Sequence, residues 1–479
     1  MNICLLNDSF PPVIDGVANT VMNYAAILTK EHLAEVHVAT PRYPGASYDG
    51  YPYDVVAYSS INIGNLMEGY RAGNPLDIPA IAELMGTEPD IIHTHCPAIS
   101  TIVARSLRVR TKAPVIFTYH TKFDVDIAHA VNSAFIKKEA AKILVDNITA
   151  CDEVWTVSHG AGENLRSLGY EGEYRVVENG VDFPRGGVDD TLVRETTKDY
   201  DLPEGVPVFL FVGRIIEYKG IPLILDAMRI LKERGKDYRM VFVGGGTDED
   251  QIHATAEEYG LTDKVFFTGP IHDRQALRAW NTRADLFLFP STYDTNGIVV
   301  REAAACGLAS VLVRGSCAAE GITNGRNGFF IDETAESLAS LLCDFPGGIP
   351  AMREAGEHAM NEIYISWEDS VRHAYSLYEE VLEKKANGEY LSAWQQRMEE
   401  FKENRRESAE QRRARIRRRE ERLRETLTGI ARVPVSFHEG MMDNMQQIKN
   451  GVKKAGAEAG RVRQNVWERA REILYGPDE

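Results

Sequence analysis

The chain has 479 residues, of which 44% are hydrophobic, and a formal net charge of −17 at pH 7. This length exceeds a single domain, and no stretch approaches the roughly 18 apolar residues of a membrane-spanning helix. Six scattered cysteines include no Cys-x-x-Cys pair, which argues against a zinc site or a disulfide framework. The chain starts directly as a strand, without the basic segment of a signal peptide. We therefore expect a cytoplasmic protein of at least two domains.

The first half of the chain alternates apolar strands with helical stretches. Residues 2–6 form a predicted strand, followed by a loop that contains Gly16 and by a helix over 19–29. Further strands are predicted at 35–39, 91–93, 115–118 and 153–157. This pattern is typical of a Rossmann-like domain, here residues 1–182. The loop lacks the Gly-x-Gly-x-x-Gly fingerprint of a dinucleotide site, so Gly16 is either a turn glycine or one that admits a ligand.

Three histidines follow strands of this domain, at the sheet edge where open α/β sheets bind ligands. His93 and His95 close one strand, whereas His120 follows another strand and enters a polar loop. Each histidine taken singly is better explained as structural than as catalytic, and His120 is the best functional candidate. His93 and His95 have a spacing found in metal sites, but no third ligand lies near them in the sequence, and we predict no metal.

A second run of strands and helices follows a polar segment at 183–203, which we interpret as a linker because it lacks periodicity. Strands are predicted at 208–212, 238–243, 264–268, 286–289 and 310–313. Helices are predicted at 221–234 and, closing the globular region, at 367–384. We therefore expect a second Rossmann-like domain over residues 204–384, which ends with that closing helix.

The loop after the first strand of the second domain carries two cations. Arg214 and Lys219 lie between Gly213 and Gly220, at the end of a strand and just before a helix. Two fixed cations beside the backbone N–H groups of a helix start would neutralise a diphosphate. The alternative is a pair of solvated side chains on a surface loop.

A second candidate ligand site lies between the predicted strand at 286–289 and a helix that starts near Ile298. Asp294 lies in the intervening loop and Glu302 on the first turns of the helix, with seven residues between them. Gly297 lies between the two, where a backbone can approach a ligand closely. Carboxylates beside a helix N-terminus suit a ligand with an anionic group and many hydroxyls, such as a nucleotide-sugar. An ordinary loop with surface carboxylates explains the spacing equally well.

Four stretches together resemble the retaining glycosyltransferases of family 4, which have the GT-B fold of two Rossmann-like domains facing a cleft. They are Phe-Pro-Pro-Val-Ile-Asp-Gly-Val at 10–17, Thr-Tyr-His-Thr at 118–121, the loop 213–220, and the segment from Asp294 to Glu302. The last matches the Glu-x7-Glu motif of the family, with Asp294 where the family usually has Glu. The resemblance covers about residues 1–380.

The resemblance implies a role for each matching residue. Glu302 would hold the ribose hydroxyls of the donor, and Arg214 and Lys219 would bind its diphosphate. His120 would face the reacting sugar and the acceptor from the first domain. Further donor-binding or sugar-contacting positions are Gly16, Gly213, Asp294, Asn296, Gly297, Ile298 and Val299. Because cations and a helix N-terminus would oppose the charge of the leaving diphosphate, we expect that neither a metal nor a cofactor is required.

Two short motifs narrow the expected acceptor. Tyr-His-Thr-Lys-Phe-Asp at 119–124 and Tyr-Asp-Thr-Asn-Gly at 293–297 are most similar to enzymes that glucosylate diacylglycerol. We therefore expect transfer of a hexose, with retention, from a nucleotide-sugar such as UDP-glucose to a membrane lipid such as diacylglycerol. Two alternatives remain open: a saccharide or small soluble acceptor, and a non-catalytic GT-B scaffold.

Two parts of the chain are candidates for contact with an anionic membrane. Residues 131–145 form a predicted basic amphipathic helix, which can equally pack on its own sheet with its lysines in water. Residues 385–479 form a charged helical extension, and from residue 384 to the end the chain carries 22 Lys and Arg against 16 Asp and Glu. A solvated helix or self-association explains the extension as well. Nucleic acid is disfavoured as a partner because aromatic residues are sparse there and Glu is abundant. We expect a peripheral location on the inner face of the cell membrane.

Overall fold

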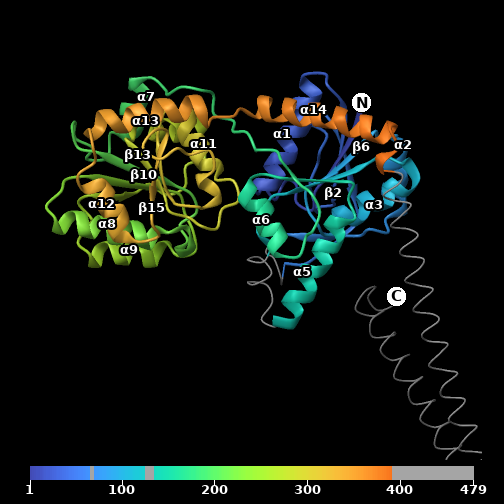
Figure 1. Ribbon diagram of the computed structural model, residues 1–479, viewed down its shortest axis with the longest axis horizontal. Coiled ribbons are helices and arrows are strands. Elements are labelled where there is room, and N and C mark those ends of the chain that lie inside the picture. The colour runs from blue at the N-terminus through green and yellow to red at the C-terminus, as the bar shows by residue number, and fades with distance from the viewer. Residues whose placement is uncertain (65–68, 124–133, 391–479) are drawn as a thin grey trace, which may run out of the picture. The chain divides into compact units, whose positions relative to one another are not determined.

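The computed structural model describes residues 1–64, 69–123 and 134–390 (Figure 1). Two parallel β-sheets organise these residues, one formed from segments within 2–176 and the other from segments within 208–331. Helices pack on each sheet (Figure 1). The predicted class, α/β with two Rossmann-like domains, is therefore confirmed.

The first sheet has seven parallel strands in the order β3-β2-β1-β6-β7-β8-β9. Their bounds are β1 Asn2–Leu6, β2 Glu35–Pro41, β3 Asp54–Tyr58, β6 Ile91–Thr94, β7 Val115–Tyr119, β8 Glu153–Thr156 and β9 Arg175–Val176. A separate antiparallel hairpin, β4 Ser60–Asn62 with β5 Arg71–Gly73, follows β3. Because all seven strands run the same way, the loops at their carboxyl ends gather along one edge.

Helices cover both faces of this first sheet. One core contains side chains of α2 Ile78–Gly86, α3 Ile99–Thr111, α5 Ala134–Thr149 and α6 His159–Ser167. The other core contains side chains of α1 Gly16–Lys30, which Asp15 caps by accepting hydrogen bonds from the backbone N–H groups of Val17 and Ala18. Alternate strand residues, such as Leu5 and Leu6, point into opposite cores.

The helix that closes the globular region, α14 Trp367–Ala386, corrects one prediction. The sequence interpretation placed it with the second domain, but it packs beside α1 on the first sheet (Figure 1). Its buried face, which includes Val371, Leu377 and Tyr378, lies in the same core as Ile3 and Trp155. An amphipathic helix shows which of its faces is apolar, but not which sheet will cover that face, so the sequence pattern fitted either domain.

The second sheet has six parallel strands in the order β12-β11-β10-β13-β14-β15. Their bounds are β10 Val208–Val212, β11 Arg239–Val243, β12 Val265–Phe267, β13 Leu286–Phe289, β14 Ser310–Val313 and β15 Gly328–Ile331. The helices of this domain are α7 Asp190–Thr197, α8 Ile221–Glu233, α9 Glu249–Glu258, α10 Arg274–Arg283, α11 Ile298–Ala305, α12 Ala335–Cys343 and α13 Gly348–Glu362. The central strands β10 and β13 are buried along their whole length, which explains their uninterrupted apolar sequences.

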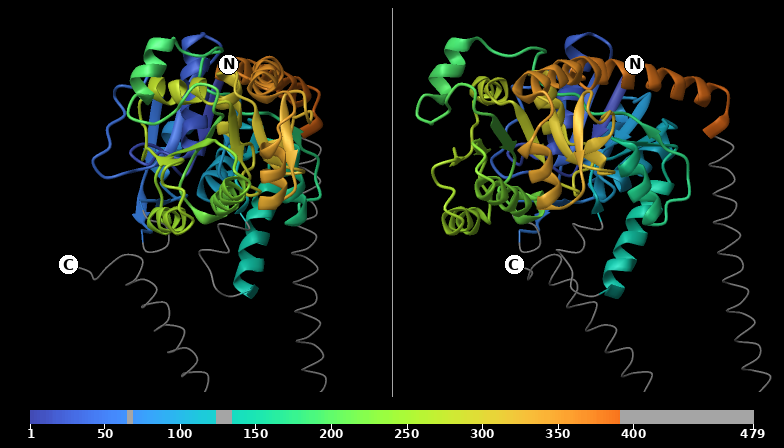
Figure 2. Two further views of the ribbon diagram at one scale, coloured as in Figure 1. Left: turned by 90° about the vertical axis from the view of Figure 1, so that its left-hand side faces the viewer. Right: turned by 60° about the vertical axis from the view of Figure 1, so that its left-hand side comes forward.

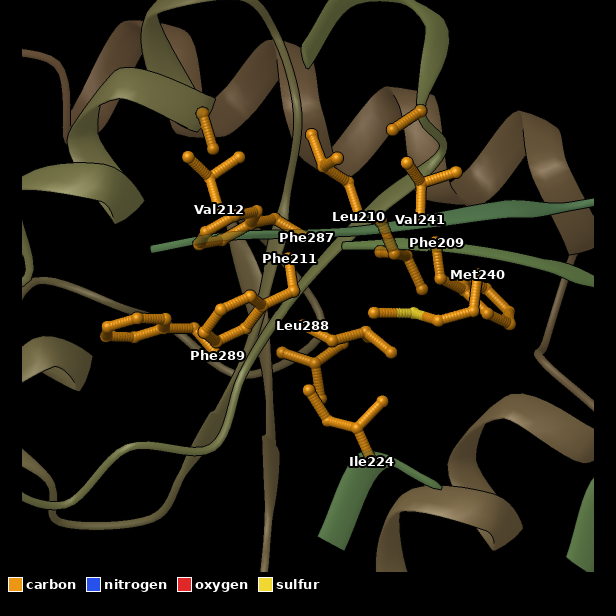
Figure 3. Close-up of a cluster of buried hydrophobic side chains, with 14 of the residues drawn as sticks. Phe209, Leu210, Phe211, Val212, Ile224, Met240, Val241, Phe287, Leu288 and Phe289 are labelled. Carbon is orange, nitrogen blue, oxygen red and sulfur yellow. The ribbon is translucent and has the colours of Figure 1, made fainter. Parts of the chain in front are cut away.

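Aromatic rings fill much of the second core. Figure 3 shows Phe211 of β10 beside Phe289 of β13, and their ring centroids are 6.1 Å apart. Ile224 of α8 lies in the same cluster and is fully buried. This packing fixes the ends of β10 and β13 relative to each other, and the two loops that carry the predicted donor site start from those ends.

The segment 183–203 is more regular than the predicted linker. It contains α7, which Asp189 caps through the backbone N–H groups of Thr191 and Leu192 and which contacts α10. Eight residues are too few to show a helical period in the sequence, and only the cap residue signals this helix.

The candidate membrane segments are described only in part. The helix α5 begins at Ala134, so residues 131–133 of the predicted basic helix lie outside the described residues, as does the extension after Tyr390. In the described part of α5, Val145 and Ile148 are buried against the sheet. Lys138, Lys142 and Ile143 are exposed. Among the helices described, none combines the length and the apolar character needed to cross a bilayer.

Candidate active site

The candidate active site is built from loops at the carboxyl ends of strands in both domains. In the first domain, Gly16 follows the loop after β1, and His120 follows β7 directly. In the second, Arg214 and Lys219 follow β10, while Asp294 follows β13. The strands β10 and β13 are neighbours in the sheet, which brings these two loops together although 75 residues separate Lys219 from Asp294.

Lys219 and Asp294 form the central contact of this site. Lys219 ends a short 3-10 helix, η1 Glu217–Lys219, and its Nζ lies 2.6 Å from Oδ1 of Asp294. Ser291 donates a hydrogen bond of 2.6 Å to the other oxygen of the same carboxylate. The two charged side chains are mostly buried, with 13% and 22% of their surfaces exposed. The aspartate at position 294 therefore reaches Lys219, although it is shorter than the glutamate usual in the family. The ion pair fixes both side chains at the carboxyl ends of β10 and β13.

Arg214 is the less constrained cation of the pair predicted to bind a diphosphate. Its Nη2 donates a hydrogen bond of 2.8 Å to the hydroxyl of Tyr218, and among the described residues no carboxylate forms an ion pair with it. The guanidinium is exposed. Gly213, just before it, donates its N–H to the carbonyl of Val243 and so continues the β10–β11 pairing. Arg214 can therefore turn toward an anionic ligand without breaking an ion pair.

The start of α11 offers backbone donors. Gly297 at its N-cap has a φ of +61° and no side chain to cap the helix. The N–H groups of Ile298 and Val299 in the first turn are therefore not capped by a side chain, which is the usual arrangement at an anion-binding helix start. A Cβ at position 297 would lie 2.8 Å from the Cβ of Ala318, so glycine is required for both conformation and space.

Glu302 lies further along α11 and is buried. Its Oε1 is 2.6 Å from Nη2 of Arg274, which also pairs with Asp182 and lies over the ring of Phe183 at 4.3 Å. Burial raises the pKa of Glu302 above its ordinary value, and the charge of Arg274 opposes that shift. Arg274 could not be predicted from the sequence, because it lies on α10, 28 residues before Glu302, and no motif joins the two.

The three histidines that follow strands of the first domain, His93, His95 and His120, lie in one buried row. His93 is hydrogen-bonded to the hydroxyls of Tyr378 and Thr118 at 2.6 and 2.7 Å, which is a structural role that joins α14 to the sheet. His95 Nδ1 lies 2.9 Å from His120 Nε2. Burial lowers the pKa of His120 to about 3. At neutral pH, His120 is therefore an uncharged imidazole that can exchange hydrogen bonds but cannot act as a cation.

Side chains of the β13–α11 loop are held by backbone groups of the first domain. Thr295 donates a hydrogen bond of 2.6 Å to the carbonyl of His120, and Asn296 donates one of 2.5 Å to the carbonyl of Val157. In the other direction, Lys122 donates to the carbonyl of Thr292 at 2.9 Å. These contacts bring His120 and the segment 292–297 together, as the predicted site requires.

Glu320, which the sequence did not single out, also connects the second domain to the first. Glu320 follows η2 Cys317–Ala319, and its carboxylate accepts hydrogen bonds from the backbone N–H groups of His159 and Gly160, at 2.7 and 2.5 Å. Those groups begin α6, so the carboxylate complements the positive end of that helix.

The start of α1 is open, in contrast to the closely packed start of α11. A Cβ added at Gly16 would meet no atom within 4 Å, so space is left beside the first turn of the helix. This space lies at the carboxyl end of β1, on the sheet edge that also carries His120.

Comparison with protein families decides the class to which this arrangement belongs. Residues 14–185 match the family described as Glycosyltransferase Family 4, and residues 193–345 match Glycosyl transferases group 1. This chain belongs to glycosyltransferase family 4. It is an enzyme that transfers a glycosyl group, and the alternative of a non-catalytic scaffold is set aside.

Curated glycosyltransferases are similar to this chain over most of its described length. It is 24% identical to D-inositol 3-phosphate glycosyltransferase from Corynebacterium efficiens, over 81% of this chain and 92% of that protein. It is 25% identical to alpha-monoglucosyldiacylglycerol synthase from Streptococcus pneumoniae, over 64% of this chain and 70% of that protein. The relatives thus include both a soluble and a lipid acceptor in their names.

Solved structures confirm the GT-B fold of this glycosyltransferase. Sucrose-phosphate synthase from Thermosynechococcus elongatus aligns with a TM-score of 0.63 at 20% identity, over 79% of this chain and 98% of that one. HepE from Anabaena, in complex with UDP-glucose, aligns with a TM-score of 0.60 at 17% identity, over 80% of this chain and 100% of that one. At these identities the likeness concerns the fold.

Proposed function

We propose that this family 4 enzyme transfers glucose from UDP-glucose, with retention of configuration, to a lipid acceptor of the diacylglycerol class. The observation that carries the proposal is the convergence of Arg214, the Lys219–Asp294 pair and the uncapped start of α11 at one edge of the second sheet. This arrangement suits a ligand that joins a diphosphate to a sugar.

The proposed chemistry follows from where charge develops. When the bond between the anomeric carbon and the diphosphate oxygen breaks, the electron pair leaves with the diphosphate, and Arg214, Lys219 and the N–H groups of α11 oppose that charge. The acceptor oxygen then bonds the anomeric carbon on the same face, and its proton passes to the leaving diphosphate oxygen. The reaction in this form needs neither a metal nor a cofactor, nor a nucleophile supplied by the protein.

The remaining site residues have binding roles in this proposal. Glu302 accepts hydrogen bonds from the ribose hydroxyls of the donor, and Asp294 together with the segment 296–299 contacts its sugar. His120, neutral because burial lowers its pKa, exchanges hydrogen bonds with a sugar hydroxyl. Gly16 leaves room for the donor phosphates at the start of α1. The choice of UDP-glucose is supported by the similarly folded HepE, which was solved with that donor.

The lipid acceptor is supported by the diacylglycerol-directed relative and by the surface of α5. Lys138, Lys142 and Ile143 face solvent on this helix, and 61% of the Ile143 surface is exposed. Figure 2 shows the first turns of α5 projecting from the rest of the first domain. Two cations beside an exposed isoleucine suit the headgroup region of an anionic membrane, and we propose a peripheral location on its cytoplasmic face.

A small soluble acceptor is the second candidate, because several relatives are named for D-inositol 3-phosphate. The experiment that separates the two mixes the purified enzyme with UDP-glucose and either diacylglycerol liposomes or D-inositol 3-phosphate. Release of UDP that requires the liposomes supports the lipid acceptor, whereas release with only the soluble compound supports the second candidate. The anomeric proton of the product, observed by NMR, reports retention, and an inverted product would refute that part of the proposal.

Replacing Lys219 by Met tests the assignment of the diphosphate site. We expect kcat to fall by about 10²- to 10³-fold, as happens when one preorganised donor to a developing oxyanion is removed. The matched control is Lys198→Met, which removes the same charge from an exposed residue of the same domain. Comparable rates in the two variants would contradict the assignment.

A further inference from the structure

A pocket outside the predicted donor site opens on the first domain. It has a volume of about 640 Å³ and lies where β2 and β3 end and the β4–β5 hairpin begins. Its lining residues are Arg42, Tyr43, Pro44, Gly45, Ala46, Tyr48, Val55, Ala57, Ser59, Ser60, Arg71 and Glu83. None of them belongs to the motifs that indicated a glycosyltransferase, so the proposed reaction leaves this pocket without a role.

Arg71 is held in a fixed orientation in the wall of this pocket. Its Nε donates to Oγ of Ser60 at 2.7 Å, and its Nη2 donates to the carbonyl of the same residue at 2.9 Å. Two bonds to one residue fix the plane of the guanidinium. They leave Nη1 without a protein acceptor among the described residues.

Arg42 presents a second guanidinium to the same pocket. It follows β2 directly, and its Nη2 donates to the carbonyl of Ala57 at 2.9 Å. Ser60 connects the two arginines, because its hydroxyl accepts from Arg71 and donates to the carbonyl of Arg42. Ser59 adds a hydroxyl that accepts from the side chain of Asn74, so its own proton remains to be donated.

The positive charge of the pocket is only partly compensated. Neither Arg42 nor Arg71 forms an ion pair with a carboxylate in the part of the chain that the structure describes. Asp77 lies nearby, where its carboxylate accepts hydrogen bonds from the backbone N–H groups of Ser59 and Ala80 and also interacts electrostatically with Arg42. Glu83, which is exposed, is the acidic residue among those that line the pocket. The lining of the pocket therefore carries two guanidiniums and one carboxylate, and Asp77 beside it offsets part of the charge of Arg42.

The pocket adjoins the loop that leads to Gly16. Tyr43 and Tyr48 line the pocket, and their hydroxyls donate to the carbonyls of Asp8 and Pro11 at 3.3 and 3.0 Å. These two carbonyls belong to the loop 7–15, which leads into α1. A ligand group held in the pocket would thus lie on the acceptor side of the enzyme, in the first domain.

We propose that this pocket binds a phosphate group, with Arg42 and Arg71 as its cationic donors and the hydroxyl of Ser59 as a neutral one. Guanidinium forks match the oxygens of a phosphate, and a fixed guanidinium loses little freedom on binding. The phosphate belongs either to a small phosphorylated acceptor or to the headgroup of an anionic phospholipid beside a lipid acceptor. This site goes beyond the proposed reaction, because binding a phosphate requires no glycosyl transfer.

The test measures binding in the absence of any nucleotide-sugar. Isothermal titration compares D-inositol 3-phosphate with unphosphorylated myo-inositol, and vesicle sedimentation compares phosphatidylglycerol with phosphatidylcholine, both with the full chain. The preference for the phosphorylated probe should fall about 10-fold or more in Arg42→Gln and in Arg71→Gln, since a hydrogen bond to a charged group is lost. Glu83→Gln should strengthen the same preference, because it removes the opposing carboxylate.

Arg110→Gln is the matched control, since it removes one positive charge from an exposed position at the end of α3. Sensitivity of D-inositol 3-phosphate binding to Arg42 and Arg71 supports a phosphorylated acceptor, and sensitivity of only the vesicle binding supports a phospholipid headgroup. Equal behaviour of these variants and the control with both probes would overturn the proposal. Arg42 is exposed, so its replacement tests the site even if the Arg71 variant does not fold. An enzyme without lipid glucosylation but with intact phosphate binding would refute only the proposed function.

Discussion

At the scale of single residues, the most informative side chain is Glu302, because the charge that its proposed role in donor binding requires is disfavoured by its burial. Burial raises its pKa, and Arg274 opposes this shift without cancelling it. A carboxyl whose pKa is raised in the folded state stabilises the fold below its unfolded pKa, and that contribution is lost as the pH rises through the folded value. Ionisation of Glu302 at higher pH therefore lowers the free energy of unfolding.

The variant Glu302→Gln separates the two effects. We expect UDP-glucose to bind at least about 10-fold more weakly, because the charged acceptor of the ribose hydroxyls is lost. Relative to the variant, the wild-type enzyme should lose free energy of unfolding as the pH rises from about 4.3, the ordinary pKa of a glutamate, toward neutrality. Urea unfolding across that range measures the difference. A wild type that gains stability relative to the variant over the same range would contradict the assigned environment.

His120 should give stability the opposite pH dependence from Glu302, because burial lowers its pKa. Its pKa is lowered to about 3 by burial, whereas an unfolded histidine has a pKa of about 6.5, so acid favours the unfolded chain between these values. His120→Gln should therefore reduce the loss of unfolding free energy between about pH 6.5 and pH 4, by up to about 1.4 kcal/mol per pH unit. The kcat of the wild type should show no ionisation of this residue between about pH 5 and pH 8. An identical pH slope of stability in both proteins would show that His120 titrates normally.

At the scale of elements, the starts of α1 and α11 differ in whether the backbone conformation and the packing require a glycine. Gly297 has a positive φ and no room for a Cβ, whereas Gly16 has open space around it and lies in no strained conformation. The fold therefore requires glycine at 297, but not at 16. The role of Gly16 in binding the donor stays a prediction.

Two alanine variants test this contrast. Gly297→Ala should lower the free energy of unfolding by about 1–3 kcal/mol, from backbone strain and the contact with Ala318. Gly16→Ala should leave stability within about 0.5 kcal/mol of wild type, yet raise the KM for UDP-glucose. Thermal unfolding and steady-state kinetics of both variants measure these effects. An unchanged KM in Gly16→Ala would remove this residue from the donor site.

At the scale of the whole molecule, we expect α14 to stabilise the fold and the extension 391–479 to contribute to membrane binding. The helix buries Trp367, Val371 and Tyr378 in the first core, so its removal would expose apolar surface. We expect deletion of residues 391–479 to preserve the unfolding transition of the two sheets. The same deletion should weaken binding to vesicles that contain phosphatidylglycerol, because it removes a basic segment. Sedimentation with such vesicles measures this, and unchanged binding would exclude the extension from membrane contact.

Much of the fold was predictable from the sequence because the strands of parallel sheets are buried on both faces. Uninterrupted apolar runs such as 208–212 and 286–289 have few alternatives to a central strand, and both are strands in the structure. Loops with glycine and charge at the ends of these runs marked the candidate site, since ligands bind at that edge. The site residues Lys219 and Asp294 were found in this way, and their roles in the reaction stay predictions.

The tertiary structure decided what depends on contacts between distant segments. An apolar helix face does not specify its partner, so the sequence could not assign α14 to the first sheet. Spacing could not show that Arg274 pairs with Glu302, or that Arg42 and Arg71 share a pocket, because each pair meets only when different elements pack together. The sequence by itself determined two Rossmann-like domains and the glycosyltransferase motifs, since these follow from local apolar pattern and loop composition. The structure alone placed the charges that give those loops their chemistry, because electrostatic interactions depend on distance in space and not on separation along the chain.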